Sequence, residues 1–264
     1  MKNTKVYLMS TENVKDPRTF ASWKEFLPKE RWEKTVRPLK EEDRKTELAA
    51  WFLLYQALRE WGISEEKINA DGAYYYGEHG KPMRRNEEVC FNLSHSGKYV
   101  LCAVSEMEIG CDIEKIKEVK WKLAKRFFSE KEYDFLVRLG RQEKLMKPGE
   151  TVKSGKTDKQ ENINRQKEKG EIKENAYTVE EAFTRFWVLR ESYVKTTGEG
   201  LGAALTGLDF SDILGQKNSK GKKNGEFLEE TFFEMEYDGY RIAICGEKDS
   251  KPKFVVYRGT IDNC

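Results

Sequence analysis

Residues 89–115 read VCFNLSHSGKYVLCAVSEMEIGCDIEK, and this stretch decides how the rest of the chain is interpreted. Apolar and small or polar residues alternate over residues 89–94, which predicts a strand that stops at the turn residues His95-Ser96-Gly97. Residues 99–104 are rich in β-branched and aromatic side chains, and residues 109–114 alternate again. Both patterns predict further strands.

The last of these strands carries two acids. Residues i and i+2 of a strand share a face, so Asp112 and Glu114 project together while Cys111 and Ile113 point the other way. We expect the two carboxylates to line one wall of a solvent-facing cleft, which makes this stretch the candidate site.

The composition excludes few partners by itself. The chain has 264 residues, enough for one large or two small domains, and its hydrophobic fraction of 38% is low for a compact core throughout. With 48 basic and 46 acidic residues the net charge is +2, so overall charge does not argue for nucleic acid or an anionic membrane.

The first residues, MKNTKVYLMSTEN, have a lysine at each end of a very short apolar run. This pattern fits neither a signal peptide nor a membrane span, so we expect a cytoplasmic protein without a membrane partner. The five cysteines, at positions 90, 102, 111, 245 and 264, include no C-x-x-C spacing. They are expected to be reduced and mostly buried.

Hydrophobic periodicity predicts the main helices. Over residues 41–61 the apolar positions recur every three or four residues, and Gly62 ends the pattern. Residues 5–9 are expected to form a short strand, and the apolar positions of residues 20–27 have helical spacing. Residues 68–82 predict a strand flanked by loops, with Lys81 in a constrained turn.

The second half repeats this mixture. Residues 120–137 have a helical period, and Ser129 with Glu132 forms a capping box that predicts a second helix start. Thr178 and Glu181 form another capping box, opening a helix that should end near Gly198. Segments of residues 208–257 have strand patterns.

Residues from about 140 to 176 have no aromatic side chain, few aliphatic ones and dense mixed charge. Such a composition predicts a disordered insertion, with a solvent-exposed helix as the alternative. Long helices and several strands recur on either side of it. We therefore predict an α+β fold of two similar lobes, residues 1–107 and 108–264.

Two charged features are ambiguous when taken alone. The basic stretch of residues 29–45 suits a multiply phosphorylated ligand or an acidic partner, but its interspersed acids also fit a solvated helix face. Glu191 and Lys195 lie one helical turn apart, and in isolation they would be a surface ion pair of little energetic weight.

Four motifs occur together in order: F-N-L-S-H-S-G at 91–97, G-C-D-I-E at 110–114, R-F-F-S at 126–129 and W-x-x-R-E-S-Y-V-K at 187–195. The combination resembles the 4′-phosphopantetheinyl transferases, in particular the larger, pseudo-dimeric surfactin type. The resemblance covers most of residues 27–257 apart from the insertion. It implies two lobes related by a pseudo-twofold axis around coenzyme A, in a monomer.

The resemblance also implies site residues. Asp112, Glu114 and Glu191 match the magnesium-binding acids, and Lys195 matches the lysine near the transferred phosphate. Ser94 and His95 match the coenzyme A contact motif, and Lys81 matches a residue near the nucleotide. Lys34, with Arg31 or Lys29, matches the residues that hold the 3′-phosphate. The family commonly has an arginine where this chain has Thr46, so one phosphate contact is lost or moved to Lys45 or Arg44.

The implied reaction is attack by a serine of an apo acyl or peptidyl carrier protein on the β-phosphate of coenzyme A, with release of 3′,5′-ADP. Mg²⁺ favours such carboxylate and phosphate oxygens, and cations offset the developing charge. Asp112, Lys195 and Glu191 are the catalytic candidates, and the base is Glu191, a water held by the metal, or hydroxide. The carriers would belong to peptide, polyketide or fatty-acid synthesis.

Two other functional classes are weighed against transfer. A degenerate homologue would hold coenzyme A or a carrier domain without reacting, and Thr46 is the feature in its favour. A basic protein that contacts nucleic acid has only residues 29–45 behind it and lacks aromatics interleaved on a sheet.

Overall fold

The computed structural model describes residues 4–21, 23–24, 27–85, 89–146, 177–200, 202, 205–214, 220–247 and 252–258. Its helices and strands confirm a mixed α+β fold. Contacts group the chain into two compact units, the first made of residues 1–116, 187–205 and 229–264 and the second of residues 117–186 and 206–228. The predicted lobes, 1–107 and 108–264, follow a different division and stay a prediction.

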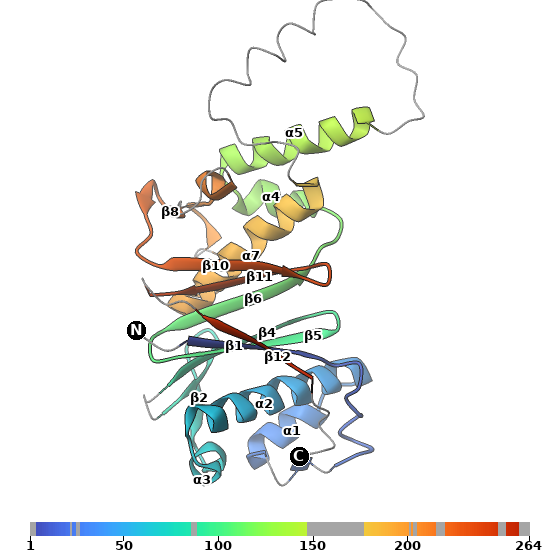
Figure 1. The fold of residues 1–264 in the computed structure, drawn as a ribbon, viewed down its shortest axis with the longest axis vertical. Coiled ribbons are helices and arrows are strands. Elements are labelled where there is room, and N and C mark those ends of the chain that lie inside the picture. The colour runs from blue at the N-terminus through green and yellow to red at the C-terminus, as the bar shows by residue number, and fades with distance from the viewer. Residues whose placement is uncertain are drawn as a thin grey trace, which may run out of the picture. The chain divides into compact units, whose positions relative to one another are not determined.

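A four-stranded sheet lies at the centre of the first unit. Its order is β12 (Lys253–Tyr257), β1 (Thr4–Ser10), β5 (Tyr99–Ser105) and β4 (Cys90–Ser96). β1 pairs in parallel with β12 and antiparallel with β5, and β4 pairs antiparallel with β5. β1 and β12 lie side by side in Figure 1, although their residues are about as far apart in sequence as the chain permits.

A second, three-stranded antiparallel sheet belongs to the same unit, in the order β10 (Thr231–Tyr237), β11 (Tyr240–Gly246) and β6 (Ile109–Lys115). Its register places Asp112 opposite Ala243 and Glu114 opposite Arg241. The two predicted acids therefore lie on β6, at the edge of this sheet.

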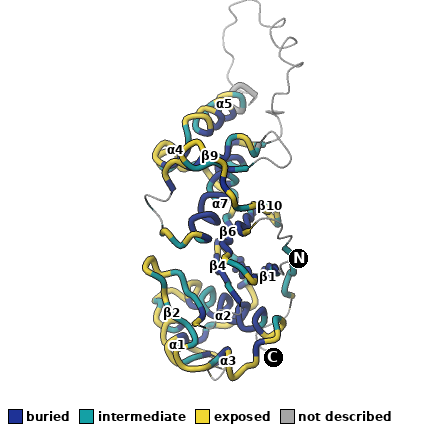
Figure 2. The backbone as a smooth tube through the Cα atoms, turned by 90° about the vertical axis from the view of Figure 1, so that its left-hand side faces the viewer, coloured by how far each residue is buried: buried dark blue, intermediate teal, exposed yellow. Residues whose placement is uncertain are grey.

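The four-stranded sheet is buried on both faces. Val6 and Leu8 of β1 join Ile113 and other apolar residues of the three-stranded sheet in one cluster. The alternate residue Tyr7 joins a second cluster that contains the buried face of α2 (Glu41–Trp61). These elements are dark blue over much of their length in Figure 2. The strict alternation follows from the two-residue period of a strand.

α2 has the bounds that the apolar period predicts. Its core-facing residues include Leu48, Phe52 and Leu58, and Gly62 ends it with a φ of +97°, a left-handed conformation that glycine adopts without a steric penalty. α3 (Glu65–Asn69) follows, and then β2 (Tyr74–Tyr76) and β3 (Pro82–Arg84) form a two-stranded sheet.

The helical spacing over residues 20–27 was misleading, because none of the described residues in that range is in an α-helix. The first helix is α1 (Lys29–Val36), which begins directly after Pro28. A proline disfavours helical geometry at the residue before it, so a helix begins more easily after Pro28 than through it.

The second unit holds α4 (Trp121–Phe127), α5 (Glu130–Met146) and the first turns of α7 (Val179–Thr197), together with η5 (Ser211–Leu214) and a small sheet of β7 (Leu208–Asp209), β8 (Lys222–Lys223) and β9 (Glu226–Phe227). Phe128 packs against Phe183 and Phe186 at ring-centroid distances of 5.4 and 5.7 Å. The unit boundary falls within α7, between Phe186 and Trp187.

Both predicted capping boxes are confirmed. The Ser129 amide donates to Glu132 Oε2 at 2.7 Å, while the Glu132 amide donates to Ser129 Oγ at 3.3 Å. Thr178 and Glu181 make the same reciprocal pair at 2.8 and 3.2 Å. The second carboxylate oxygen of Glu132 also accepts from the amide of Phe210 at 2.8 Å, and this glutamate is fully buried.

α5 continues beyond Gly140, where the insertion was expected to begin. Residues 141–146 are mostly strong helix formers, and one glycine costs a helix only about 1 kcal/mol. The disorder predicted for the rest of the insertion falls on residues 147–176, outside the described residues. No helix in the described part of the chain has the length and apolar character needed to cross a membrane.

The four cysteines within the described residues form no disulfide, with Cys102, Cys111 and Cys245 buried and Cys90 half-buried, which confirms the prediction for these four. Burial raises the pKa of the Cys111 thiol to about 12. These thiols are therefore packing groups in the strands that carry the site.

We predict that Glu132→Ala lowers the free energy of unfolding by about 2–4 kcal/mol, because it leaves the buried amide of Phe210 and the half-buried amide of Ser129 without their carboxylate acceptor. Glu181→Ala removes only the exposed half of a capping box and should cost about 1 kcal/mol or less. Urea denaturation of the two variants measures the difference. Equal losses would contradict a structural role for the Phe210 contact.

Candidate active site

Side chains of β4 join the two sheets of the first unit. Asn92 Oδ1 accepts from the amide of Cys111 at 3.0 Å, Ser94 Oγ from the amide of Ile113 at 3.4 Å, and Ser96 Oγ from the amide of Lys115 at 3.2 Å. We call these three hydrogen bonds the polar seam. Alternate residues of β4 thus satisfy alternate amides at the edge of β6, where backbone pairing is absent.

The polar seam also places the acids. Ser94 Oγ donates to Asp112 Oδ1 at 2.7 Å, and Ser96 Oγ donates to Glu114 Oε2 at 2.9 Å. β4 continues through His95 and Ser96, so the predicted strand end at Ser94 was two residues too early. The extension arises because His95 and Ser96 pair with Val100 and Tyr99 of β5 around a tight turn at Gly97.

Lys195 of α7 completes this cluster. Its Nζ lies 2.7 Å from Asp112 Oδ1 and 3.0 Å from Ser94 Oγ. Burial alone would lower the pKa of Lys195, but the neighbouring charges, Asp112 foremost, outweigh it and raise that pKa. Lys195 is therefore a cation held in place by the acid of β6.

The expectation that Asp112 faces solvent was wrong. Its side chain is 6% exposed, whereas that of Lys195 is 28% exposed. The reason is the close approach of α7 to β6, which covers the carboxylate. A carboxylate that is buried in this way needs a cation or hydrogen-bond donors around it.

Gly110 permits that approach. A Cβ at this position would collide with the carbonyl oxygen of Ser192 and the amide nitrogen of Thr196, both in the backbone of α7. The glycine of the G-C-D-I-E motif thus allows helix and strand backbones to touch. Lys195 reaches Asp112 because of that contact.

Glu191, one turn before Lys195 on α7, is the third predicted acid. It is 7% exposed, and burial together with the charge of Asp112 raises its pKa to about 7. The charge of Glu114 acts in the same direction, while Lys195 acts against it. The three acids therefore influence one another electrostatically.

These acids fit a divalent cation chemically, although they are not preassembled around one. Asp112 Oδ2 is a buried oxygen that has no hydrogen-bond partner among the described residues. Among the described residues, no three His, Cys, Asp or Glu side chains form a ready metal-binding group. Hard oxygen donors of this kind suit Mg²⁺, which also takes oxygens from water and substrate phosphates.

A cavity of about 600 Å³ in the first unit contains the predicted phosphate-binding residues Arg31, Lys34 and His95, together with Arg37. The rest of its lining is Pro38, Leu39, Glu47, Ala50, Trp51, Tyr76, Pro82 and Leu93. Leu93 and His95 face this cavity because alternate residues of β4 point to one side, whereas Ser94 points to Asp112.

Tyr76 holds two of the cations in this cavity. The Lys34 ammonium lies 3.6 Å from the centre of its ring and the Arg31 guanidinium 4.6 Å, and Arg31 also donates to the Tyr76 hydroxyl. Arg31 stacks on Trp51 at 3.8 Å, and burial lowers its pKa. Cation–π contacts of this kind keep positive charges close together without a carboxylate partner.

Arg44 does not replace the arginine that the family commonly has at the position of Thr46. Its guanidinium donates to both oxygens of Asp16 and to the carbonyl groups of Pro38 and Leu39. This pairing lowers the pKa of Asp16 to about 2. Lys45 pairs with Glu41 instead. Arg37 is the additional cation of the cavity.

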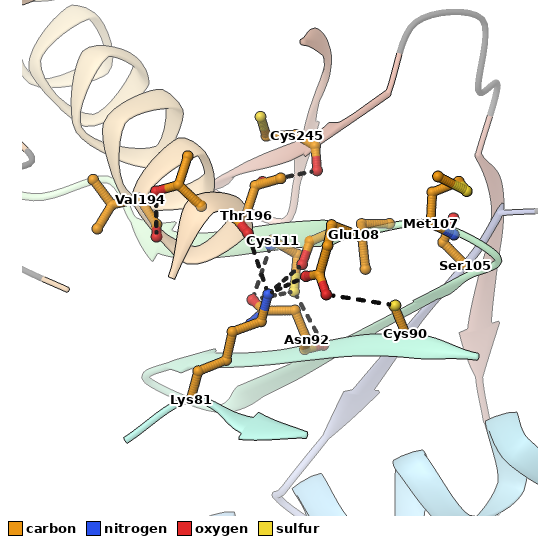
Figure 3. A network of polar contacts seen from close by, with 12 residues as sticks. Lys81, Cys90, Asn92, Ser105, Met107, Glu108, Cys111, Val194, Thr196 and Cys245 are labelled. Carbon is orange, nitrogen blue, oxygen red and sulfur yellow. Dashed lines mark hydrogen bonds and ion pairs between the residues drawn. The ribbon is translucent and has the colours of Figure 1, made fainter. Parts of the chain in front are cut away.

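Lys81, predicted to lie near the nucleotide, has an ammonium group that contacts three oxygen atoms of the protein. Its Nζ lies 2.8 Å from Glu108 Oε2 and 3.4 Å from the carbonyl oxygens of both Ile109 and Thr196 (Figure 3). Its side chain is 12% exposed, and it is not part of the described lining of the 600 Å³ cavity, whereas its neighbour Pro82 is.

Residues 108–245 match the model of the 4′-phosphopantetheinyl transferase superfamily, which is just over half of the chain. The chain belongs to this superfamily. It is accordingly a transferase whose reaction moves the phosphopantetheine arm of coenzyme A to a carrier protein.

Individual members are similar over most of their length. The chain is 26% identical over 232 residues to 4′-phosphopantetheinyl transferase Sfp of Bacillus subtilis, covering 86% of this chain and 85% of that protein. It is 28% identical over 232 residues to the transferase ffp of Bacillus subtilis, with the same coverage. It is 26% identical over 169 residues to the transferase gsp of Aneurinibacillus migulanus, covering 64% of this chain and 55% of that protein.

Sequence reasoning overlooked four residues of this candidate site. Asn92 and Ser96 form the polar seam, and the regular N-x-S-x-S alternation along β4 was a signal for them. Arg37 and Tyr76 line the cation-rich cavity. Arg37 was visible only as one member of a basic stretch, and nothing local distinguishes Tyr76 from its two tyrosine neighbours.

We predict that Gly110→Ala displaces α7 from β6 and separates Lys195 from Asp112. Transfer should fall at least about 100-fold, since small misplacements of catalytic groups have effects of that size. Overpacking should also cost about 1–3 kcal/mol of stability. Gly140→Ala is the matched control, because a Cβ there meets only ordinary contacts within a helix. Full activity in Gly110→Ala would refute the requirement for backbone contact.

Glu191 should make the metal-free protein more stable in acid. Its raised pKa means that the folded protein binds a proton that the unfolded chain releases between about pH 4.5 and 7. The free energy of unfolding should therefore fall by on the order of 1 kcal/mol per pH unit as the pH rises through this window. Glu191→Gln should lack this slope. The measurement is urea denaturation in a chelator at several pH values, and identical slopes would contradict the assignment.

Proposed function

We propose that this chain transfers the 4′-phosphopantetheine arm of coenzyme A to a serine of an apo acyl or peptidyl carrier protein, releasing 3′,5′-ADP. The observation that carries the proposal is the Lys195 ammonium shared between Asp112 and Ser94, on a strand whose next residue, His95, lines a cation-rich cavity. A cleft that combines acids and cations suits a diphosphate reacting in the presence of a metal.

The nucleotide part of coenzyme A would bind in the 600 Å³ cavity. Lys34, Arg31 and Arg37 supply positive charge for the 3′-phosphate, and His95 reaches toward the diphosphate. Ser94 lies on the other face of β4 and serves the diphosphate through Lys195. We omit Lys81 from the coenzyme A ligands, because oxygen atoms of the protein already surround its ammonium.

Asp112, Glu114 and Glu191 would hold Mg²⁺. When bound, the ion supplies positive charge to the diphosphate and lowers the repulsion among the three acids. The buried Asp112 Oδ2, to which no residue in the described part of the chain donates, and the raised pKa of Glu191 both support this ligand set.

The remaining work belongs to the side chains. The serine oxygen of the carrier forms a bond to the β-phosphorus, and the bond from that phosphorus to the oxygen of 3′,5′-ADP breaks. Lys195 turns from Asp112 to the phosphate, where its compact charge stabilises the negative charge that develops on the oxygens. We propose Glu191 as the acceptor of the serine proton, because it lies one turn from Lys195 on the same helix.

The finer features of the fold are part of the proposal. Two lobes related by a pseudo-twofold axis would enclose coenzyme A, and a carrier with acidic helices would meet positive or apolar surface near the site.

A binding protein that holds coenzyme A without transfer is the second candidate. The observation that favours it is that Arg44 and Lys45, the cations nearest to Thr46, pair with Asp16 and Glu41.

We predict that coenzyme A, Mg²⁺ and an apo carrier protein yield a carrier heavier by one phosphopantetheine arm, detected by intact-protein mass spectrometry. Asp112→Asn keeps the size of the side chain but removes its charge, and should slow transfer at least about 100-fold, as loss of one preorganised electrostatic group typically does. Asp43→Asn, at an exposed position in the first turn of α2, is the control and should retain full activity.

A panel of peptidyl, polyketide and fatty-acid carriers tests the proposal broadly. If no carrier gains mass and no 3′,5′-ADP is released, the transfer proposal is wrong. Calorimetry then separates the alternatives, since coenzyme A binding that does not respond to Mg²⁺ would favour the binding protein.

A further inference from the structure

The C-terminal end of α7 must be fixed if Lys195 is to stay on Asp112. The last carbonyl groups of a helix lack partners within the helix, so its final turn frays unless something binds them. Here the Gly198 amide donates to Val194 O at 2.9 Å. Thr196 Oγ1 lies 2.8 Å from Ser192 O and 3.1 Å from Cys245 O of β11, so its hydroxyl ties the helix to that strand.

Lys81 binds the carbonyl group of Thr196 in this turn. Its Nζ faces three oxygen atoms: the carbonyl oxygens of Thr196 and Ile109 and a carboxylate oxygen of Glu108. An ammonium group has three N–H donors, so each oxygen can accept one. Figure 3 shows Lys81 reaching from its own loop toward the end of α7 and the start of β6. A cation at this place also complements the negative end of the helix dipole.

The loop that carries Lys81 touches the end of α7 at a second point. A Cβ at Gly200 would collide with the side chain of His79, so the chain that leaves α7 passes directly against this loop. Gly200 has a φ of +76°, which suits the turn made there. Two separate contacts therefore join the loop of residues 77–81 to the segment that follows Glu191 and Lys195.

We propose that the Lys81 side chain is a positioning group of the transferase and that its ammonium does not bind coenzyme A. It fixes the last turn of α7 against the start of β6, so that Lys195 and Asp112 keep their mutual register. The inference rests on the proposed function, since it assigns a role within that reaction. It differs from the role that the motif resemblance implies for the same lysine.

The experiment compares Lys81→Met, Lys81→Arg and the wild-type transferase with coenzyme A, Mg²⁺ and an apo carrier. Lys81→Met should lower kcat about 10-fold or more, since misplaced catalytic groups lose rate steeply, while KM for coenzyme A changes less than about twofold. Calorimetry should give the same affinity for 3′,5′-ADP in all three proteins. Lys81→Arg keeps the charge and should restore much of kcat.

Lys24→Met, at an exposed position, is the matched control and should behave as wild type. Glu108→Gln removes the charge of the nearest partner of Lys81 but leaves the lysine, and should lower kcat by a smaller factor with KM again unchanged. This variant carries the test if Lys81→Met does not fold.

The outcome that overturns the inference is a rise of about 10-fold or more in KM and in the dissociation constant for 3′,5′-ADP in Lys81→Met, which would make Lys81 a nucleotide ligand. Unchanged kcat in both Lys81→Met and Glu108→Gln would overturn it as well. Neither result would affect the proposed function, which fails only if the wild-type chain transfers nothing.

Discussion

The polar seam between β4 and β6 is the interaction on which the site depends. β6 lies at the edge of its sheet, and its outward amides would be buried without partners if Asn92, Ser94 and Ser96 did not accept from them. Because the period of both strands is two, the same serines meet Asp112 and Glu114. One set of hydroxyl groups therefore joins two sheets and orients two acids.

Burial of charge then sets the electrostatics of the cluster. Asp112 is almost fully covered, and Lys195 balances it at 2.7 Å, whereas at Glu191 burial and the charge of Asp112 outweigh the effect of Lys195 and raise the pKa. The asymmetry therefore disfavours the charged form of Glu191. It also means that a ligand which brings positive charge to Glu191 relieves a strain that the fold itself imposes, so binding and stability are linked in this site.

Much of the local structure could be predicted from residue patterns. The apolar period and Gly62 gave the bounds of α2, and the capping boxes at Ser129 and Thr178 gave two helix starts, because these signals act within a few residues. Contacts between distant segments could not be predicted in this way. The partners of Lys81 lie 27, 28 and 115 residues away, and Arg31 becomes a buried cation only when the aromatic residues of α2 and β2 close around it.

The same limit applies to roles carried over from a motif. A resemblance assigns neighbouring residues to one ligand, but a strand sends neighbours in opposite directions, and Ser94 and His95 accordingly face different parts of the site. The neighbouring residues of the Gly-Lys-Pro turn also face different places, because Pro82 lines the cavity and the Lys81 side chain lies at the end of α7. A short motif of this kind can thus bind substrate through one residue and hold a neighbouring helix through the next. Loss of either function would look identical in an assay of overall activity, and only the separation of kcat from KM distinguishes them.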